Sequence, residues 1–214
     1  MPITEDDNFL SYLPYSHSYE RTAGYYLALF SGSRIFYAQN IETLTSQMPE
    51  VKPTIMMTVP RLLDKIYNRL LRSSEDMPSG LRKKLFENAV SMAQERTVSK
   101  SSLKWKIADS LVYSKIREKT GGRLRFFVSG GGALNKNIGE FFEYIGIKTL
   151  EGYGLTETSP VISVNPLEKN KYGTVGPPLS GVRVKLSDEN EIIVSGDLVM
   201  KGYYKDEAST AEII

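Results

Sequence analysis

Residues 123–157 read Arg-Leu-Arg-Phe-Phe-Val-Ser-Gly-Gly-Gly-Ala-Leu-Asn-Lys-Asn-Ile-Gly-Glu-Phe-Phe-Glu-Tyr-Ile-Gly-Ile-Lys-Thr-Leu-Glu-Gly-Tyr-Gly-Leu-Thr-Glu. Two short runs, Arg123–Val128 and Ile147–Leu150, are typical of buried strands, and a glycine-rich segment follows each. The stretch between them, Asn135–Tyr144, has the apolar spacing of a helix. Two strands joined through a helix form a crossover, which predicts neighbouring parallel strands.

The same alternation extends toward the N-terminus. Pro60 fits the first turn of a helix, because that turn does not need the amide hydrogen that proline lacks. The expected strands are 9–13, 34–38 and 54–59, and the expected helices are 17–30, 41–48, 61–72, 81–96 and 103–119. Strands alternating with helices predict an α/β fold, with a mostly parallel sheet flanked by helices.

The pattern changes after Pro160. Short β-like runs at 161–164, 182–186 and 191–194 are separated by Gly and Pro turns, and a helix-like segment covers 207–214. We therefore expect an α/β subdomain over 1–164, with a helical insert at about 70–120, and the start of a small β-rich subdomain over 165–214.

Composition excludes several classes of function. The 27 Lys and Arg nearly balance the 25 Asp and Glu, so no global field indicates a nucleic-acid binder. The absence of Cys rules out disulfides and thiol nucleophiles, and a single His, His17, rules out a multi-histidine metal cluster. The polar start, Met1–Asn8, does not resemble a secretory signal, and no apolar run approaches the roughly 20 residues of a membrane span. We expect a reducing, cytoplasmic setting.

The two glycine-rich segments, Ser129–Leu134 and Glu151–Glu157, are the candidate site. At the carboxyl ends of parallel strands they would face one crevice, where glycine lets the backbone approach a ligand; the alternative is two tight turns. A P-loop sequence is absent, and Asn135 stands where a dinucleotide fingerprint needs its third glycine. In the second segment, Tyr153 offers a ring for a base, Thr156 a hydroxyl for a phosphate and Glu157 a carboxylate for Mg²⁺. That combination suits ATP.

These segments also carry a resemblance. Residues 129–134 resemble the Ser-Gly-Gly-Ala-Pro-Leu motif, and 151–157 the Tyr-Gly-x-Thr-Glu motif, of the adenylate-forming superfamily, which includes acyl-CoA synthetases, peptide-synthetase adenylation domains and luciferases. Further matches occur in the family's order: Leu13-Pro-Tyr-Ser-His17 with Glu20-Arg21, Gly173-Thr-Val-Gly-Pro-Pro178, and Gly196–Tyr204. Gly132-Ala133 departs from the motif, which has Ala-Pro there. The segment 115–125 and the helical insert resemble the long-chain fatty acyl-CoA synthetases.

The resemblance implies an activity and a site. The activity is a ligase reaction of fatty acid, ATP and CoA, through an acyl-adenylate, with Mg²⁺ bound by Glu157. Thr156 would meet the α-phosphate, Tyr153 would stack on adenine, and His17 would border the acyl and adenylate sites. The implied catalytic residues are Thr156, Glu157 and His17, and the implied nucleotide-binding residues are Ser129, Gly130, Gly131, Gly132, Ala133, Glu151, Gly152, Tyr153, Gly154, Leu155 and Thr156.

The resemblance also implies that the chain is a central portion of the large N-terminal domain of such an enzyme. A phosphate loop would precede Met1, and a ribose-binding Asp and a small C-terminal domain with a catalytic Lys would follow Ile214; Asp197 comes too early to be that Asp. We therefore expect the chain alone to be inactive. Two alternatives stay open: an enzyme for an amino or aryl acid, and a non-catalytic nucleotide-binding module.

Other features have both an ordinary and a functional interpretation. A lone histidine such as His17 is more often structural than functional. Tyr25, Tyr26 and Phe30 recur at helical spacing, which indicates core rather than an acyl channel. A basic stretch is either a solvated helical face or a weak, peripheral contact with the anionic inner face of a membrane. Its members are Lys100, Lys104, Lys106, Lys115, Arg117, Lys119, Arg123 and Arg125.

Overall fold

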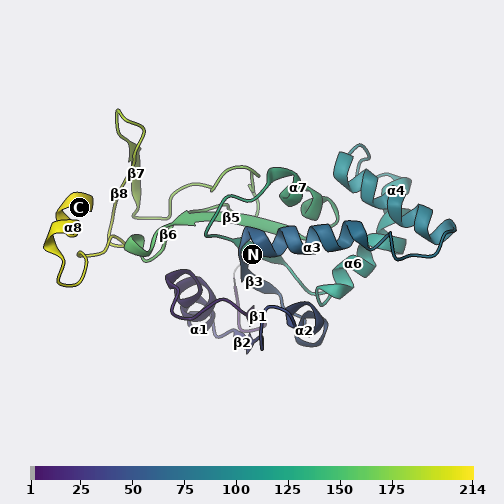
Figure 1. Ribbon diagram of the computed structural model, residues 1–214, viewed down its shortest axis with the longest axis horizontal. Coiled ribbons are helices and arrows are strands. Elements are labelled where there is room, and N and C mark those ends of the chain that lie inside the picture. Colours follow the sequence, from purple (N-terminus) through teal and green to yellow (C-terminus); the bar gives the residue numbers. More distant parts are fainter. Residues whose placement is uncertain (1–2) are drawn as a thin grey trace.

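A six-stranded sheet forms the centre of the computed structural model, which describes residues 3–214 (Figure 1). The strand order is β2-β1-β3-β4-β5-β6; neighbours from β2 to β5 are parallel, and β6 is antiparallel to β5. The strands are β1 (Asn8–Ser11), β2 (Arg34–Tyr37), β3 (Ile55–Thr58), β4 (Phe126–Ser129), β5 (Lys148–Gly154) and β6 (Val161–Val164). The predicted mostly parallel sheet is confirmed.

Helices cross over between the parallel strands and flank the sheet. They are η1 (Glu20–Tyr26), α1 (Leu27–Phe30), α2 (Leu44–Val51), α3 (Pro60–Arg72), α4 (Leu81–Glu95), α5 (Leu103–Ala108), η2 (Asp109–Tyr113), α6 (Ser114–Lys119) and α7 (Lys136–Tyr144). Pro60 is at the start of α3, as predicted.

Alternate residues of the strands bury against opposite faces of the sheet, as the two-residue period of a strand requires. Leu10, Met56 and Phe127 belong to a large apolar cluster with side chains of α2, α3, α4 and α7. Their neighbours Phe9 and Ile55 belong to a second cluster, with side chains of the segment that forms η1 and α1. Both faces are therefore covered, which explains why these strands are apolar throughout.

Three predicted helices differ from the observed ones in their bounds. The helix expected over 17–30 begins at Glu20 as the wide π-turn η1 and continues as α1. The helix expected over 41–48 begins at Leu44, because the Asn40 side chain accepts hydrogen bonds from the amides of residues 42 and 43 and holds them in a turn. The helix expected over 103–119 consists of α5, η2 and α6.

The strands beside the glycine segments also differ from prediction. β4 begins at Phe126, three residues later than expected, after the turn at Gly121 and Gly122. β5 was expected to end at Leu150 but continues to Gly154, because β6 pairs with its far half, Tyr153 opposite Ser163. Much of the second glycine segment is thus strand rather than loop, and pairing with a later strand is a non-local effect.

The last part of the chain lies to one side of the sheet in Figure 1. It contains an antiparallel hairpin of β7 (Arg183–Leu186) and β8 (Ile192–Ser195), and the helix α8 (Glu207–Ile213). Nearly every residue of the hairpin is exposed, so it contributes little to a core. The division of the chain near residue 165 stays a prediction.

Candidate functional site

The two glycine segments start side by side. Ser129 is in register with Glu151 on the parallel strands β4 and β5, so both segments leave the same edge of the sheet. This arrangement confirms the prediction that they meet at the carboxyl ends of adjacent strands, where ligands bind in open α/β sheets.

The segments differ in what they expose. In the first, Ser129 and Gly130 are buried, whereas Gly131, Gly132 and Ala133 are exposed. Gly131 has a φ of +77°, a conformation that favours glycine. In the second, Leu155 and Thr156 are exposed, and Gly152 is half-buried. The exposed residues are accessible to a ligand, and the buried ones support the backbone beneath them.

One glycine of the second segment has a structural reason of its own. A Cβ at Gly154 would lie 1.6 Å from the carbonyl oxygen of Pro160, which approaches across the β5–β6 pair. Gly154 is therefore required by strand packing whether or not a ligand binds, which is the ordinary interpretation of this residue.

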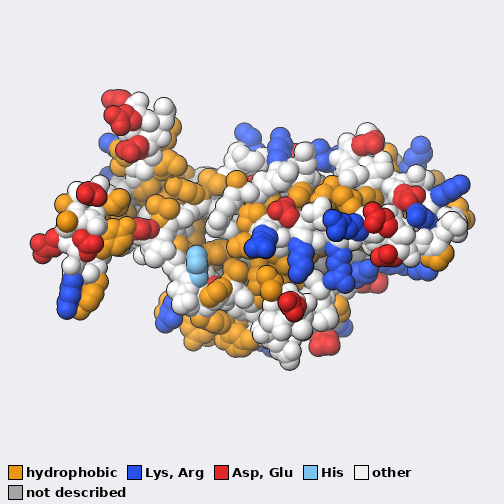
Figure 2. All heavy atoms as spheres, in the orientation of Figure 1, with side chains coloured by type: hydrophobic (Ala, Val, Ile, Leu, Met, Phe, Trp, Pro, Cys, Tyr) orange, Lys and Arg blue, Asp and Glu red, His pale blue; other side chains and the backbone are white. Residues whose placement is uncertain are grey.

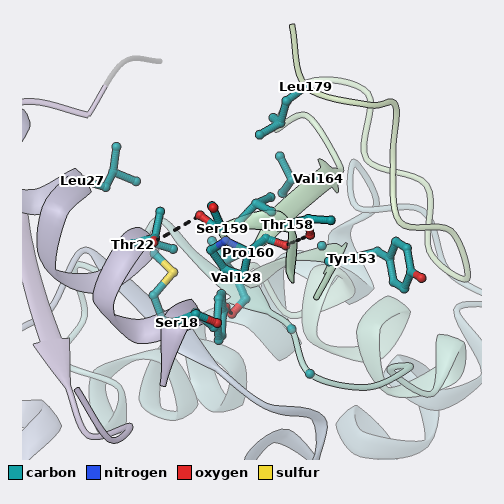
Figure 3. A pocket seen from close by; sticks show the side chains of 18 of the residues that line it. Ser18, Thr22, Leu27, Val128, Tyr153, Thr158, Ser159, Pro160, Val164 and Leu179 are labelled. Carbon is teal, nitrogen blue, oxygen red and sulfur yellow. Dashed lines mark hydrogen bonds between the residues drawn. The ribbon is translucent and has the colours of Figure 1, made fainter. Parts of the chain in front are cut away.

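Strand β5 separates two environments. Leu150 packs in the apolar cluster beneath η1 and α1, and Gly152 and Gly154 follow it on the same face of the strand. Tyr153 belongs to the opposite face, and Figure 3 shows its ring pointing away from Ser18, Thr22 and Ser159. Tyr153 is nevertheless among the residues that line the cavity under η1, although its ring points away from these three residues.

A cavity of about 750 Å³ lies on the η1 side of β5. Its lining includes the apolar side chains of Ala23, Leu27, Phe126, Val128 and Leu150, and backbone of both glycine segments. Of the residues described, 3–214, none that lines this cavity is Asp or Glu. Volume and lining are those of a site for a largely apolar small molecule.

Two of the three predicted catalytic residues belong to the lining of this cavity. His17 and Thr156 both line it, and the hydroxyl groups of Ser18 and Thr156 are 3.3 Å apart. The Thr22 hydroxyl donates to the carbonyl oxygen of Ser159 at 3.4 Å (Figure 3). His17 is exposed; it appears in pale blue in Figure 2. The structure thus brings the segment around His17 and the Thr-Glu motif together.

Two aromatic residues of this region were wrongly expected in the core. Tyr26 is 49% exposed and Phe30 is 93% exposed, and both line the cavity. The reason is geometric: the helix packs through Ala28, which is fully buried, and turns these rings away from the cluster. Tyr25 instead packs edge-on against Tyr15, with ring centroids 5.5 Å apart.

Glu157 lies in the short 3₁₀ helix η3 (Thr156–Thr158), directly after β5. Hydrogen bonds from its own backbone amide and from the Tyr203 hydroxyl, the latter at 2.8 Å, lower the pKa of the Glu157 carboxyl. Among residues 3–214, no three His, Asp or Glu side chains gather to hold a metal ion. A single ionised carboxylate fits Mg²⁺ that arrives with nucleotide phosphates, because Mg²⁺ is commonly held by one or two carboxylates plus phosphates.

Glu20 is a buried residue of this region, and no role was predicted for it from the sequence. It is 1% exposed, and its carboxylate accepts a hydrogen bond from the Ser11 hydroxyl. Burial raises its pKa to about 7. Gly24 makes room for it, since a Cβ there would lie 2.4 Å from the Glu20 Oε1 atom. The run Glu20-Arg21 gave no sign that the first of two charged residues is internal.

The basic stretch is partly used inside the structure. Lys100 donates to the carbonyl oxygen of Glu143 at 2.6 Å, Arg117 pairs with Asp109 at 2.6 Å, and Arg125 pairs with Asp7. Lys100 is exposed despite its contact with Glu143, and the other exposed members are Lys104, Lys106, Lys115, Lys119 and Arg123. Fewer charges than the sequence indicates therefore face a partner. In the part of the chain described, no helix has the length and apolar character to cross a membrane.

Comparison with known proteins identifies the family. A family model described as "AMP-binding enzyme" matches residues 1–204. The chain therefore belongs to the AMP-binding enzyme family, and the expectation drawn from the sequence motifs is confirmed at this level.

Among curated proteins, the chain is similar to "Long chain acyl-CoA synthetase 7, peroxisomal" of Arabidopsis thaliana, with 37% identity over 97% of this chain and 32% of that protein. It is also 30% identical to "Long-chain-fatty-acid--CoA ligase FadD15" of Mycobacterium bovis, over 98% of this chain and 36% of that protein. The chain thus spans about a third of the length of the curated relatives it matches.

Solved structures share the fold. A benzoate CoA ligase from Burkholderia xenovorans LB400 matches with a TM-score of 0.68 at 21% identity, over 98% of this chain and 37% of that one. Apo MatB from Rhodopseudomonas palustris matches with a TM-score of 0.65 at 23% identity, over 98% of this chain and 36% of that one. At these identities the likeness concerns architecture alone.

Proposed function

We propose that this chain is the central part of an ATP-dependent long-chain fatty acid–CoA ligase. The observation that supports it most is the apolar cavity of about 750 Å³, whose lining includes His17, Thr156 and Tyr153. An acyl chain under η1 and an adenine on Tyr153 would then meet at the end of β5. The printed names of the curated relatives favour a long-chain acid.

In the proposed reaction, a fatty acid carboxylate attacks the α-phosphorus of ATP and pyrophosphate leaves; the CoA thiol then displaces AMP. Thr156 would donate its hydroxyl to the α-phosphate, and the backbone of Gly131 and Gly132 would flank the adenine. Glu157 would hold Mg²⁺, which neutralises phosphate charge when bound. The buried residues Ser129, Gly130 and Glu151 would hold the backbone of the two glycine segments in the position that these contacts need. The chain's own groups mainly position and neutralise, so no side-chain nucleophile is needed.

The cavity lining bears on the choice of acid. An amino acid substrate needs a partner for its ammonium group, and no acidic side chain within residues 3–214 lines the cavity. We therefore favour a hydrocarbon acid over an amino acid. An aryl acid is distinguished by experiment, because a ring occupies less of this volume than a long chain.

The experiment uses the full-length natural protein that contains this chain. Acid-dependent exchange of pyrophosphate into ATP is measured with a long-chain fatty acid, benzoate, malonate and an amino acid, and CoA is then added to follow the thioester. We expect the long-chain acid to give the highest kcat/KM. Preference for benzoate or an amino acid would replace the proposed substrate, and no exchange with any acid would favour a non-catalytic nucleotide-binding module.

For the 214 residues alone, we propose no acyl-CoA synthesis and weak ATP binding. Stacking on one aromatic ring contributes about 1 to 3 kcal/mol, whereas millimolar affinity already needs about 4 kcal/mol. Calorimetric titration with MgATP tests this. Micromolar binding would mean that the essential contacts lie within these residues.

We also propose a cytoplasmic protein that touches the inner face of a membrane weakly through its helical insert. Leu81 of α4 and Leu103 of α5 are 75% and 73% exposed. Lys115 and Lys119 line a groove with Leu81, Leu85 and Leu111. Apolar side chains next to cations suit the surface of an anionic bilayer.

A further inference from the structure

The Glu157 residue is held at two points by the last part of the chain. The Tyr203 hydroxyl donates to Glu157 Oε1 at 2.8 Å, and the Met200 amide donates to the Glu157 carbonyl oxygen at 2.8 Å. The side-chain contact spans 46 residues of sequence. Side chain and backbone of Glu157 are therefore both oriented by residues 200–203.

Tyr203 is itself fixed by the helix that follows it. Its amide donates to the Thr210 hydroxyl at 2.9 Å, and that hydroxyl donates to the Asp206 carbonyl oxygen at 2.7 Å. Gly202 has a φ of +144°, and a Cβ there would lie 2.7 Å from the Thr210 Cγ2 atom. The turn before α8 thus presents the Tyr203 ring in one place.

We propose that Tyr203 is a positioning residue for the Mg²⁺ carboxylate: its hydroxyl occupies Oε1 of Glu157 and leaves Oε2 for the cation. The inference rests on the proposed function, because it takes Glu157 as the metal-binding residue. A hydrogen bond to one oxygen restricts rotation of the carboxylate and favours coordination through a single oxygen.

The neighbouring tyrosine provides a matched control. Tyr204 is 87% exposed, and its ring lies 5.2 Å from the Lys205 Nζ atom. Tyr203→Phe and Tyr204→Phe each remove one hydroxyl from adjacent positions of the same turn. An effect specific to Tyr203 must therefore come from its contact with Glu157.

The test titrates Mg²⁺ in the pyrophosphate exchange assay of the full-length protein, with both variants and with Glu157→Gln. We expect Tyr203→Phe to raise the Mg²⁺ concentration for half-maximal rate between about threefold and tenfold, as loss of one hydrogen bond predicts. Tyr204→Phe should match the unmodified protein, and the thermal unfolding midpoint should change little in either.

The outcomes separate this inference from the proposed function. If Tyr203→Phe leaves the Mg²⁺ dependence unchanged while Glu157→Gln abolishes exchange, the positioning role is wrong and the proposed function stands. Equal shifts in both tyrosine variants, or a lower unfolding midpoint without a Mg²⁺ shift, would also overturn the positioning role. Full exchange by Glu157→Gln would overturn both proposals.

Discussion

The carboxylate of Glu151 accepts a hydrogen bond from the backbone amide of Leu134 at 3.0 Å, so the second glycine segment holds the first in place. Its other oxygen accepts from the amide of Gly173 at 3.2 Å. Glu151 is 4% exposed and forms both contacts inside the protein. The resemblance placed Glu151 among the nucleotide-binding residues; in the structure both of its carboxylate oxygens accept hydrogen bonds from backbone amides.

Replacing Glu151 by Gln should therefore destabilise the fold. The new amide nitrogen would face a backbone donor, and hydrogen bonds to a charged group contribute about 1.5 to 3 kcal/mol. Urea unfolding of the chain should show a loss of this size. Glu118→Gln, at an exposed position, should cause a much smaller change; equal effects would mean that the Glu151 contacts carry no special energy.

Tyr153→Ala should weaken ATP binding in the full-length protein, and Tyr153→Phe should not. Loss of stacking on one ring costs about 1 to 3 kcal/mol, which corresponds to roughly 5-fold to 150-fold in affinity. The measurement is the ATP concentration dependence of pyrophosphate exchange. An unchanged dependence in Tyr153→Ala would show that the adenine lies elsewhere.

Ala23→Phe should fill the cavity under η1 and discriminate by acyl length. The larger side chain removes volume where a chain would extend, so kcat/KM should fall for a long acid and change less for a short one. Ala211→Phe, on the exposed part of α8, is the control. Equal loss for long and short acids would indicate damage to the fold rather than a shorter channel.

Glu20 should make stability fall as pH rises from about 4.5 toward about 7. Burial raises the pKa of Glu20 in the folded chain, so the folded state binds its proton more tightly than the unfolded state. The resulting stabilisation is complete below the unfolded pKa and is lost as pH rises through the folded pKa. Urea unfolding at pH 5 and pH 8 should show a smaller difference in Glu20→Gln than in the unmodified chain. If the difference in unfolding free energy between pH 5 and pH 8 were the same in both proteins, the pH dependence would come from groups other than Glu20.

The membrane contact should depend on the cations beside the groove. Lys115→Glu with Lys119→Glu should reduce sedimentation with anionic vesicles, because each cation contributes about 1 kcal/mol near such a surface. Reversal of Lys169 and Lys185, which are exposed outside the helical insert, should have less effect. Neutral vesicles should bind neither form. If both pairs of substitutions reduced vesicle sedimentation equally, the binding would depend on the net charge of the protein and not on the groove.

The parts of the fold that sequence predicted are those decided locally. The alternation of apolar runs and helical spacing, with Pro60 and the glycine pairs as boundaries, is enough to place the parallel strands and their crossovers. The extension of β5 to Gly154 depends on β6, which lies later in the chain. The cavity depends on how η1 and α1 pack across the sheet, and the contact of Tyr203 with Glu157 joins residues 46 apart. Neither the cavity nor this contact produces a periodic pattern in the sequence from which it could be predicted.

The exposed hairpin of β7 and β8 should affect the rate at which amide hydrogens exchange with solvent. With so little apolar surface buried, this end of the chain should open locally many times for each opening of the central sheet, and its amide hydrogens should exchange with solvent correspondingly sooner. Glu157 lies between these two parts of the chain, since η3 follows β5 closely and Tyr203 holds the Glu157 carboxylate. Any molecule that immobilises residues 200–213 would therefore slow the exchange of amides beyond its own footprint, as far as η3.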